Sequence, residues 1–260
     1  MKVSLIITVY NRPKELELVL KSIERQSYQP YEVVIADDGS NFDTQKFINN
    51  YCHQTSLKII HSYQDDKGFR ASRSRNKAVL KSSGDYLVFI DGDVVLHKRF
   101  IEDHLKKSKF GYFLQGKRVL ISKTTTQKIL ESEFFNPNFL TRDLKNRHNS
   151  IYLPYLPDLI YRSNQKLNGI KTCNFSIHRE TYFKVNGFNN DIEGWGREDS
   201  EFVSRLYNSG VKRRDLRFCA IQYHLFHREY SRKSLRLNDK ILKESIDLSI
   251  TSCRNGINQL

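Results

Sequence analysis

The sequence of 260 residues has no long apolar run, only four cysteines and no internal repeat. No apolar stretch approaches the roughly 20 residues that a membrane-spanning helix needs, which argues against such a helix. The cysteines lie far apart and form no CxxC pair, so neither a zinc site nor a disulfide framework is indicated. Isolated, reduced thiols are typical of a cytoplasmic protein. The four positions are Cys52, Cys173, Cys219 and Cys253.

Apolar residues make up a modest 38% of the chain, but they are concentrated in runs such as residues 3–9 and 86–90. Concentrated runs can build a core and argue against wholesale disorder. The first run follows Lys2 and could imitate a signal peptide. It is short, however, no small-residue cleavage site follows it, and Pro13 lies close behind. We therefore interpret residues 3–9 as a buried strand.

The chain is strongly basic, because 43 Lys and Arg residues against 29 Asp and Glu give a net charge of +14. The corresponding pI is about 9.6. Such a charge predicts an anionic partner, which could be a nucleic acid, a nucleotide or a membrane surface.

The first part of the chain alternates strand and helix patterns, which predicts an α/β fold with a mainly parallel central sheet flanked by helices. We expect strands at 3–9, 31–36, 57–61 and 85–90, and helices from Pro13, at 42–52 and at 70–81. In the less regular second part we expect strands at 111–121, 171–177 and 218–224 and helices at 179–185, 198–208 and 231–249. The polar stretch 123–165, with three scattered prolines, predicts a long, partly ordered loop. We divide the chain into one domain at 1–230 and a basic, amphipathic helical appendage at 231–260.

Acidic clusters follow two of the expected strands, at residues 37–40 (DDGS) and 91–93 (DGD). Parallel sheets bind ligands at the carboxyl ends of their strands, so both clusters are expected at one edge. Like charges held together there need compensation. Hard carboxylate oxygens suit Mg²⁺ or Mn²⁺, which favours a metal site at 91–93 over a plain turn.

Residues 67–81 contain six basic residues and no acidic one. A charge run of this kind is usually a solvated helix face. Gly68 before the helix, with Arg75 and Asn76 within it, is also suited to a phosphate group, because helix N-termini bind anions. Both interpretations stay open from the sequence.

The segment 193–199 (EGWGRED) carries the chain's only tryptophan, Trp195, between two glycines. A flat indole can stack on a sugar ring, and Glu198 and Asp199 open the next helix, where the dipole stabilises an ionised carboxylate. Such a group can act as a general base. An N-cap beside a core tryptophan explains each residue separately but not their adjacency. Downstream, His224 and His227 end an expected strand, and one of them is expected to reach a cation.

In this order the motifs resemble those of the inverting family 2 glycosyltransferases with the GT-A fold. Residues 37–40 resemble the DDGS element, whose first carboxylate meets uracil, and residues 91–93 resemble the DxD motif, which holds a metal against the sugar-nucleotide diphosphate. Residues 194–199 resemble the GWGxED segment of the β-1,4-galactosyltransferase-like and chondroitin-polymerase-like branch, with Arg197 in place of the usual glycine. The resemblance covers about residues 1–230.

The resemblance implies a role for each matching residue. Asp199 would be the base, with Glu198 beside it, and Trp195, Gly194 and Gly196 would form the acceptor or sugar platform. The metal would be held by Asp93 and His224, with Asp91 and His227 as alternatives. The expected donor site comprises Val9, Asn11, Arg12, Asp37, Gly39, Gly68, Arg75, Asn76, Asp91 and Gly92.

The implied activity is transfer of a sugar from a UDP-sugar, galactose or an N-acetylhexosamine, to a glycan or lipid-linked glycan. The cofactor would be Mn²⁺ or Mg²⁺ and the product β-linked, as in surface polysaccharide or lipooligosaccharide synthesis. We expect a cytoplasmic enzyme that contacts the anionic inner face of the membrane peripherally. A non-catalytic sugar- or nucleotide-binding module of the same fold is the alternative. A nucleic-acid-binding protein is disfavoured, because no nucleic-acid motif accompanies the charge.

Overall fold

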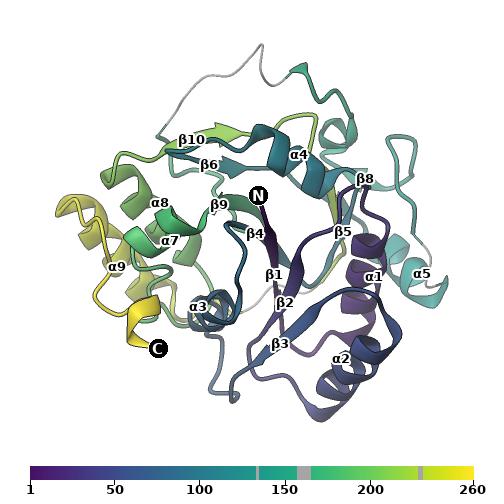
Figure 1. The fold of residues 1–260 in the computed structure, drawn as a ribbon, viewed down its shortest axis with the longest axis horizontal. Helices are drawn as coiled ribbons and strands as arrows, with labels where there is room; N and C mark the ends of the chain where they lie inside the picture. The colour runs from purple at the N-terminus through teal and green to yellow at the C-terminus, as the bar shows by residue number, and fades with distance from the viewer. Residues whose placement is uncertain (133–134, 157–164, 228–230) are drawn as a thin grey trace.

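A seven-stranded sheet forms the centre of the molecule (Figure 1). The computed structural model describes residues 1–132, 135–156, 165–227 and 231–260. The strand order is β10-β6-β9-β4-β1-β2-β3, with β9 antiparallel to both neighbours and the other pairs parallel. The predicted α/β architecture is therefore confirmed. The strands are β1 (Val3–Val9), β2 (Glu32–Asp37), β3 (Ile59–Tyr63), β4 (Tyr86–Asp91), β6 (Tyr112–Gln115), β9 (Asn174–His178) and β10 (Lys212–Asp215).

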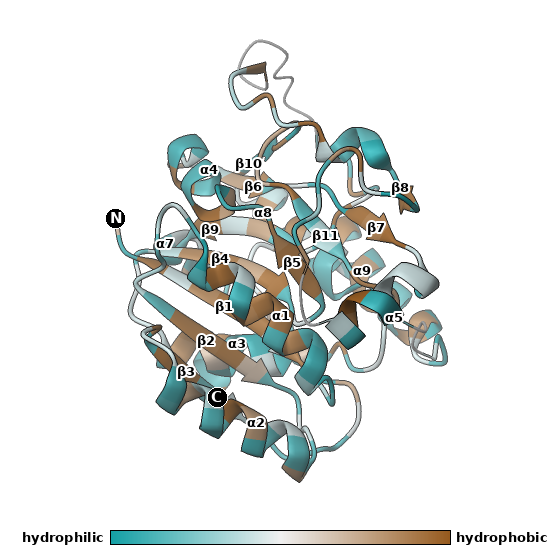
Figure 2. Cartoon of the chain, turned by 90° about the vertical axis from the view of Figure 1, so that its right-hand side faces the viewer, coloured by the Kyte–Doolittle hydropathy of each residue, from teal (hydrophilic) through white to brown (hydrophobic). Residues whose placement is uncertain are grey.

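Both faces of this sheet are covered, because successive side chains of a strand point to opposite faces. In β1, Leu5 and Ile7 join the core that α1, α2 and α4 cover, whereas Ile6 joins the core under α3, α7 and α8. The central strands β1, β2 and β4 are correspondingly rich in apolar residues (Figure 2). The helices are α1 (Pro13–Glu24), α2 (Phe42–Gln54), α3 (Ala71–Lys81), α4 (Phe100–Lys107), α5 (Lys123–Ser132), α7 (Arg179–Lys184), α8 (Glu198–Asn208) and α9 (Leu235–Asp247), with single 3₁₀ turns at Arg147–Ser150 and Ile257–Gln259.

A second, four-stranded sheet adjoins the first and has the order β5-β11-β7-β8. Its strands are β5 (Val94–Leu96), β11 (Gln222–His224), β7 (Val119–Ile121) and β8 (Leu144–Lys145). β5 begins directly after Asp93, and its antiparallel register with β11 places His224 opposite Val94. This pairing brings a residue near 224 to the end of β4.

Several predicted elements were wrong. The single strand expected at 111–121 is two strands in different sheets, β6 and β7, because the chain changes direction at Gly116, where an added Cβ would lie 2.1 Å from the Asn174 side chain. The stretch expected to be a long loop contains helix α5, whose Thr126 and Ile129 are buried. Strand β10 was missed because its sequence, KRRD, is wholly charged; its parallel pairing with β6 is a tertiary interaction.

The segment after residue 230, which we predicted to be a helical appendage, makes contacts with the rest of the domain. Ile257 is 1% exposed and lies in the core under α3. The backbone of Asn190 donates to the Asn255 carbonyl at 2.8 Å. Helix α9 packs beside α8 (Figure 1), and it buries two polar residues, Asn238 and Ser245, where an apolar stripe was expected. The boundary at 230 itself stays a prediction.

Candidate active site

The carboxyl ends of β1, β2 and β4 lie side by side, as the sequence predicted. In the parallel register Val9 lies opposite Asp37, and Thr8 lies opposite Asp91. The turn after β1 is fixed to the turn after β2: Asn11 accepts a hydrogen bond from the Asn41 backbone at 2.7 Å. Asn11 has a φ of 52°, a left-handed conformation that asparagine tolerates. The two loops therefore form one edge.

The two aspartates of the DDGS segment have different surroundings. Asp37 is fully buried, accepts a hydrogen bond from the Ser40 backbone at 2.8 Å and lies 2.8 Å from His61 Nε2. Asp38 accepts hydrogen bonds from Gln64 at 2.6 Å and from the Arg70 backbone at 2.7 Å. Burial raises the pKa of Asp38 to about 6. Asp37 thus has a structural role within the loop, and its predicted contact with uracil stays a prediction.

The glycines of the predicted donor site shape the loops around it. Gly39 has a φ of +94°, and a Cβ there would lie 2.5 Å from the Asp66 backbone, so the 64–68 loop packs directly on it. Gly68 also has a positive φ, +83°, and its N–H donates to Asp66 at 3.0 Å. At Gly92 a Cβ would lie 3.0 Å from the Thr8 carbonyl. Each position is confined by close packing or by a backbone conformation that favours glycine.

Arg75 connects two motifs that are more than 100 residues apart in sequence. Its side chain is nearly buried, donates to the Thr8 hydroxyl at 2.9 Å, and places Nη2 3.5 Å from Asp91 and Nη1 3.6 Å from Asp199. The guanidinium compensates part of the negative charge at this edge. Burial nevertheless raises the pKa of Asp91, with the charges of Asp93 and Asp199 adding to the effect.

The Asn76 side chain, predicted to belong to the donor site, makes its hydrogen bonds inside the core. Its side chain is fully buried and uses its amide N–H groups on the Phe188 carbonyl and Asn190. Its oxygen accepts from the Phe188 backbone and the Tyr182 hydroxyl. These hydrogen bonds are all made inside the core, which gives Asn76 a structural role, and its predicted place in the donor site stays a prediction.

Asp93, His224 and His227 form a cluster in which the candidate ligand atoms lie within 4.8 Å of one another. The His224 and His227 Nε2 atoms lie 3.5 and 3.4 Å from the two Asp93 oxygens. Asp93 Oδ1 is buried and makes no hydrogen bond to the described residues. Both histidines face the carboxylate, where only one was expected to do so, because the chain turns after β11. Asp91 lies with Arg75 instead.

This donor set fits a divalent cation. One carboxylate and two imidazoles suit a metal such as Mn²⁺, and the buried, unsatisfied Asp93 oxygen is an atom that a cation would satisfy. Burial lowers the pKa of His224 to about 4, so its imidazole is neutral near pH 7, the form that binds a metal. Arg118 was missed from the sequence, and its positive charge acts on both His224 and Asp91.

Asp199 and Glu198 open helix α8 at the same edge. Thr172 donates to both Asp199 oxygens, from its backbone N–H at 3.1 Å and from its hydroxyl at 2.5 Å. Glu198 Oε2 is buried without a hydrogen-bond partner among the described residues. Burial raises the pKa of Glu198 to about 7, and the neighbouring Asp199 charge adds to this. Thr172 was missed, since nothing in its sequence context marks it.

Trp195 lies in the loop before α8 and belongs to none of the apolar cores of the described residues. It is half-buried, with the Arg232 guanidinium 5.2 Å from its ring centroid. Gly194 and Gly196 have φ values of +74° and +105°. The Gly194 N–H donates to the Phe69 carbonyl at 2.8 Å, which joins this loop to the one before α3.

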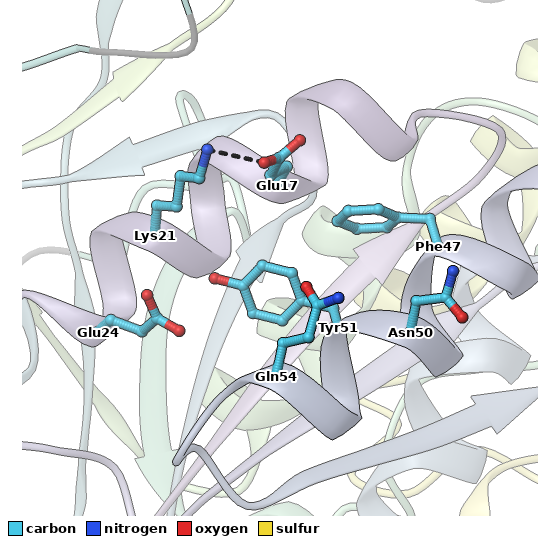
Figure 3. Close-up of a pocket in the computed structure, with 7 residues that line it drawn as sticks. All are labelled: Glu17, Lys21, Glu24, Phe47, Asn50, Tyr51 and Gln54. Carbon is cyan, nitrogen blue, oxygen red and sulfur yellow. Dashed lines mark ion pairs between the residues drawn. The ribbon is translucent and has the colours of Figure 1, made fainter.

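A pocket of about 400 Å³ lies elsewhere, between α1 and α2 (Figure 3). Polar and apolar side chains of these two helices line the pocket. Among them, Glu17 and Lys21 form an ion pair one helical turn apart on α1. It contains none of the predicted site residues. Its lining is Glu17, Lys21, Glu24, Phe47, Asn50, Tyr51 and Gln54.

The sheet with carboxylates at one edge defines a GT-A glycosyltransferase fold, and solved structures agree. The structure matches Staphylococcus aureus TarS 1–349 in complex with UDP with a TM-score of 0.64 at 18% identity, covering 93% of this chain and 64% of the TarS 1–349 chain. It matches the mannosyltransferase PcManGT from Pyrobaculum calidifontis in complex with GDP-Man and Mn²⁺ with a TM-score of 0.60 at 15% identity, covering 86% and 56%. At such identities the likeness concerns the fold.

The model of glycosyl transferase family 2 matches residues 4–172, so the chain belongs to that family. A second model, the N-terminal domain of galactosyltransferase, matches residues 160–228, which include the Trp195 loop. The chain is 24% identical over 234 residues to validoxylamine A glucosyltransferase of Streptomyces hygroscopicus subsp. limoneus and 26% identical over 226 residues to chondroitin synthase of Pasteurella multocida (strain Pm70). Each match covers 80% of this chain but 48% and 23% of those relatives, so the chain spans about half of their length or less.

Proposed function

We propose that this family 2 glycosyltransferase is a metal-dependent, inverting enzyme that moves a sugar from a UDP-sugar to a hydroxyl of a glycan or lipid-linked glycan. The observation that carries the proposal is the position of Arg75, which lies between Asp91 at the expected donor site and Asp199 at the expected base. The binding of UDP by TarS and of GDP-Man by PcManGT supports a nucleotide-sugar donor. Galactose or an N-acetylhexosamine is the donor sugar we favour.

In this mechanism Asp199 takes the proton from the acceptor hydroxyl as the hydroxyl attacks the anomeric carbon. Thr172 holds the Asp199 carboxylate in orientation through two hydrogen bonds, and Arg75 Nη1 lies 3.6 Å from it. Base and leaving group lie on opposite faces of the sugar, so the configuration inverts and an α-linked donor gives a β-linked product.

Asp93, His224 and His227 would hold a divalent cation, which supplies positive charge against the leaving diphosphate when bound. Arg12, which is hydrogen-bonded to Asp93, is positioned to contact the same anionic group. Trp195 would present its indole to the acceptor or the transferred sugar. In this role, Trp195→Ala raises the acceptor KM or lowers turnover and leaves UDP affinity near normal.

The direct test measures UDP release and product formation from a panel of UDP-sugars with Mn²⁺, Mg²⁺ or EDTA. We expect turnover of one donor with Mn²⁺ or Mg²⁺, loss of turnover in EDTA, and a β-anomeric product by NMR. Undiminished activity in EDTA would contradict the metal role, and an α-linked product from an α-linked donor would contradict inversion. Absence of turnover with every donor, alongside intact UDP binding, would favour the non-catalytic binding module.

We also propose that the acceptor is presented at an anionic membrane surface. No helix among the described residues is long and apolar enough to cross a bilayer. The exposed basic residues Lys233, Arg236 and Lys240 flank Leu237, which is 59% exposed, on α9 or just before it. Arg205 and Arg213, two further basic residues that precede α9 in the chain, are buried with acidic partners and do not belong to this surface. The proposed surface consists of Lys233, Arg236 and Lys240, on α9 and just before it.

A further inference from the structure

Helix α9 contacts the Trp195 loop through a buried amide. Asn238 is fully buried, and its Nδ2 donates to the carbonyls of Glu193 at 3.1 Å and Gly196 at 2.9 Å. These two carbonyls stand on either side of Gly194 and Trp195 in sequence. A buried donor that satisfies two loop carbonyls fixes the path of the backbone between them, because an unpaired buried carbonyl is costly.

The loop approaches α9 so closely that side chains cannot be accommodated at its glycines. A Cβ on Gly194 would lie 2.2 Å from the Ser234 hydroxyl oxygen, and a Cβ on Gly196 would lie 3.0 Å from Leu235 Cδ1. The two glycines around the tryptophan therefore do more than allow a tight turn. They also give the start of α9 room to pack on the loop.

Two further contacts, made by more exposed side chains, also join the Trp195 loop to α9 and the residues just before it. The Arg232 guanidinium lies 5.2 Å from the Trp195 ring centroid, within range of a cation–π interaction. Arg197, the last loop residue, forms an ion pair with Asp239. Together with Asn238, these contacts hold the loop from Glu193 to Arg197, the residue before α8.

We propose that Asn238 is a positioning residue: from α9 it holds the Trp195 loop, and with it the acceptor platform next to Glu198 and Asp199. The role assigned to Trp195 rests on the proposed function, whereas the contact itself does not. On this proposal the C-terminal helix is part of the active-site architecture. Sequence patterns gave no sign of this, because one asparagine in an amphipathic helix marks no contact.

The chain offers a matched control at the other end of α9. Asn208, on α8, donates from Nδ2 to the carbonyls of Ser245 at 3.0 Å and Ile250 at 2.8 Å. Asn238→Asp and Asn208→Asp therefore make the same chemical change. Each replaces an amide that serves two carbonyls with a carboxylate that cannot donate to them. Only Asn238→Asp does so at the Trp195 loop.

The experiment uses the full chain and the fluorescence of Trp195, the only tryptophan. We expect Asn238→Asp to red-shift the emission and to increase quenching by acrylamide, whereas Asn208→Asp keeps both near the wild-type values. Both variants are expected to lower the melting temperature. Equal changes in Trp195 fluorescence in the two variants, or none in Asn238→Asp, would overturn the proposal.

A second variant covers the case in which Asn238→Asp fails to fold. Asn238→Ala removes the same donor without placing a carboxylate in the buried site, and it is expected to red-shift the Trp195 emission and to increase quenching as well. An unchanged Trp195 signal in Asn238→Ala would contradict the proposal.

Enzyme kinetics supply an independent readout. Asn238→Asp should raise the acceptor KM or lower kcat by about tenfold or more, the scale expected when a reacting group is misplaced, while calorimetry with UDP and Mn²⁺ gives a near-normal Kd. A loss of UDP affinity equal to the loss of turnover would show a general structural defect and overturn the positioning role. If the wild-type protein turns over no UDP-sugar, the proposed function fails, and the fluorescence comparison still decides the role of Asn238.

Discussion

Arg12 donates a hydrogen bond to Asp93, with Nη1 2.6 Å from Oδ2. The same carboxylate oxygen lies 3.4 Å from His227 Nε2, within the cluster that fits a cation. The Arg12 guanidinium is thus paired with the Asp93 carboxylate, which a metal ion at this site would also bind. Arg12 stands at the turn into α1, where it precedes Pro13 and can rotate its long side chain without disturbing the helix. Cation binding and the Arg12–Asp93 pair are therefore expected to compete.

Replacement of Arg12 by Gln tests this competition. The pair is partly buried, and a contribution of about 1 kcal/mol, at the upper end for a surface pair, corresponds to roughly a fivefold change in affinity. We expect Arg12→Gln to bind Mn²⁺ alone about fivefold more tightly and to bind UDP in the presence of Mn²⁺ more weakly. Isothermal calorimetry measures both. Unchanged Mn²⁺ affinity would show that Arg12 does not compete.

Matched Asp→Asn variants at Asp91 and Asp93 test which of the two aspartates binds the metal. Asp93 faces His224 and His227, whereas Asp91 faces Arg75. We expect Asp93→Asn to weaken Mn²⁺ binding at least about tenfold, since a ligand matters at least as much as the outer-shell partners that are worth 10–100-fold. Asp91→Asn should keep Mn²⁺ binding near normal. Electron paramagnetic resonance of bound Mn²⁺ compares the two, and the opposite ranking would move the metal to Asp91.

The pH dependence of kcat can show whether Glu198 or Asp199 is the general base, because the two carboxyl groups have different surroundings. The pKa of Glu198 is raised to about 7, so this carboxyl is mostly protonated below pH 6 and ionised well above pH 7. Glu198→Gln mimics the protonated form. It should therefore match the wild-type kcat at low pH and differ from it only above about pH 7. Asp199→Asn should lose about 10²–10⁴-fold in kcat at every pH.

The control for this pair is Thr172→Val, which removes the hydroxyl that donates to Asp199 and keeps the backbone N–H. We expect a smaller loss of kcat than in Asp199→Asn, with donor binding retained. If Glu198→Gln loses activity at pH 6 as severely as Asp199→Asn does, Glu198 is the base and the assignment is reversed.

Local sequence patterns correctly predicted those helices and strands whose own residues carry a clear apolar or helix-opening signal. β1, β4 and α8 occur where short apolar runs or helix-opening carboxylates indicated them, because a strand buried on both faces reads as a continuous apolar run. β10 and the split between β6 and β7 depend on pairing partners distant in the chain. No local pattern carries that information.

The candidate site shows the same division. Asp93 and the two histidines could be proposed as ligands from their residue types, yet the cluster arises from the pairing of β5 with β11. The sequence left open whether Arg75 belongs to a phosphate site or to a solvated helix face, and the structure places it between two carboxylates. Asn76 shows the limit most clearly: its four hydrogen bonds are made to residues 182–190, more than 100 positions away.

The last prediction concerns the basic outer surface of α9. Each Lys or Arg near an anionic bilayer contributes about 1 kcal/mol, so a few such residues give reversible attachment. We expect the protein to sediment with vesicles containing phosphatidylserine but not with neutral vesicles, and to be released by high salt because the attraction is screened. The triple variant Lys233→Glu, Arg236→Glu, Lys240→Glu should abolish vesicle binding.

The same variant should keep its activity on a soluble acceptor and its Trp195 fluorescence, because these three side chains are exposed and the contacts of α9 with the Trp195 loop lie on its buried side. A matched triple variant, Lys46→Glu, Lys123→Glu, Lys128→Glu, at exposed positions on α2 and α5, controls for the same change in net charge. Leu237→Ser should weaken vesicle binding further if its exposed side chain enters the bilayer interface. Equal sedimentation with neutral vesicles, or sedimentation with neither kind, would remove the membrane proposal and leave the assignment of the active site as it stands.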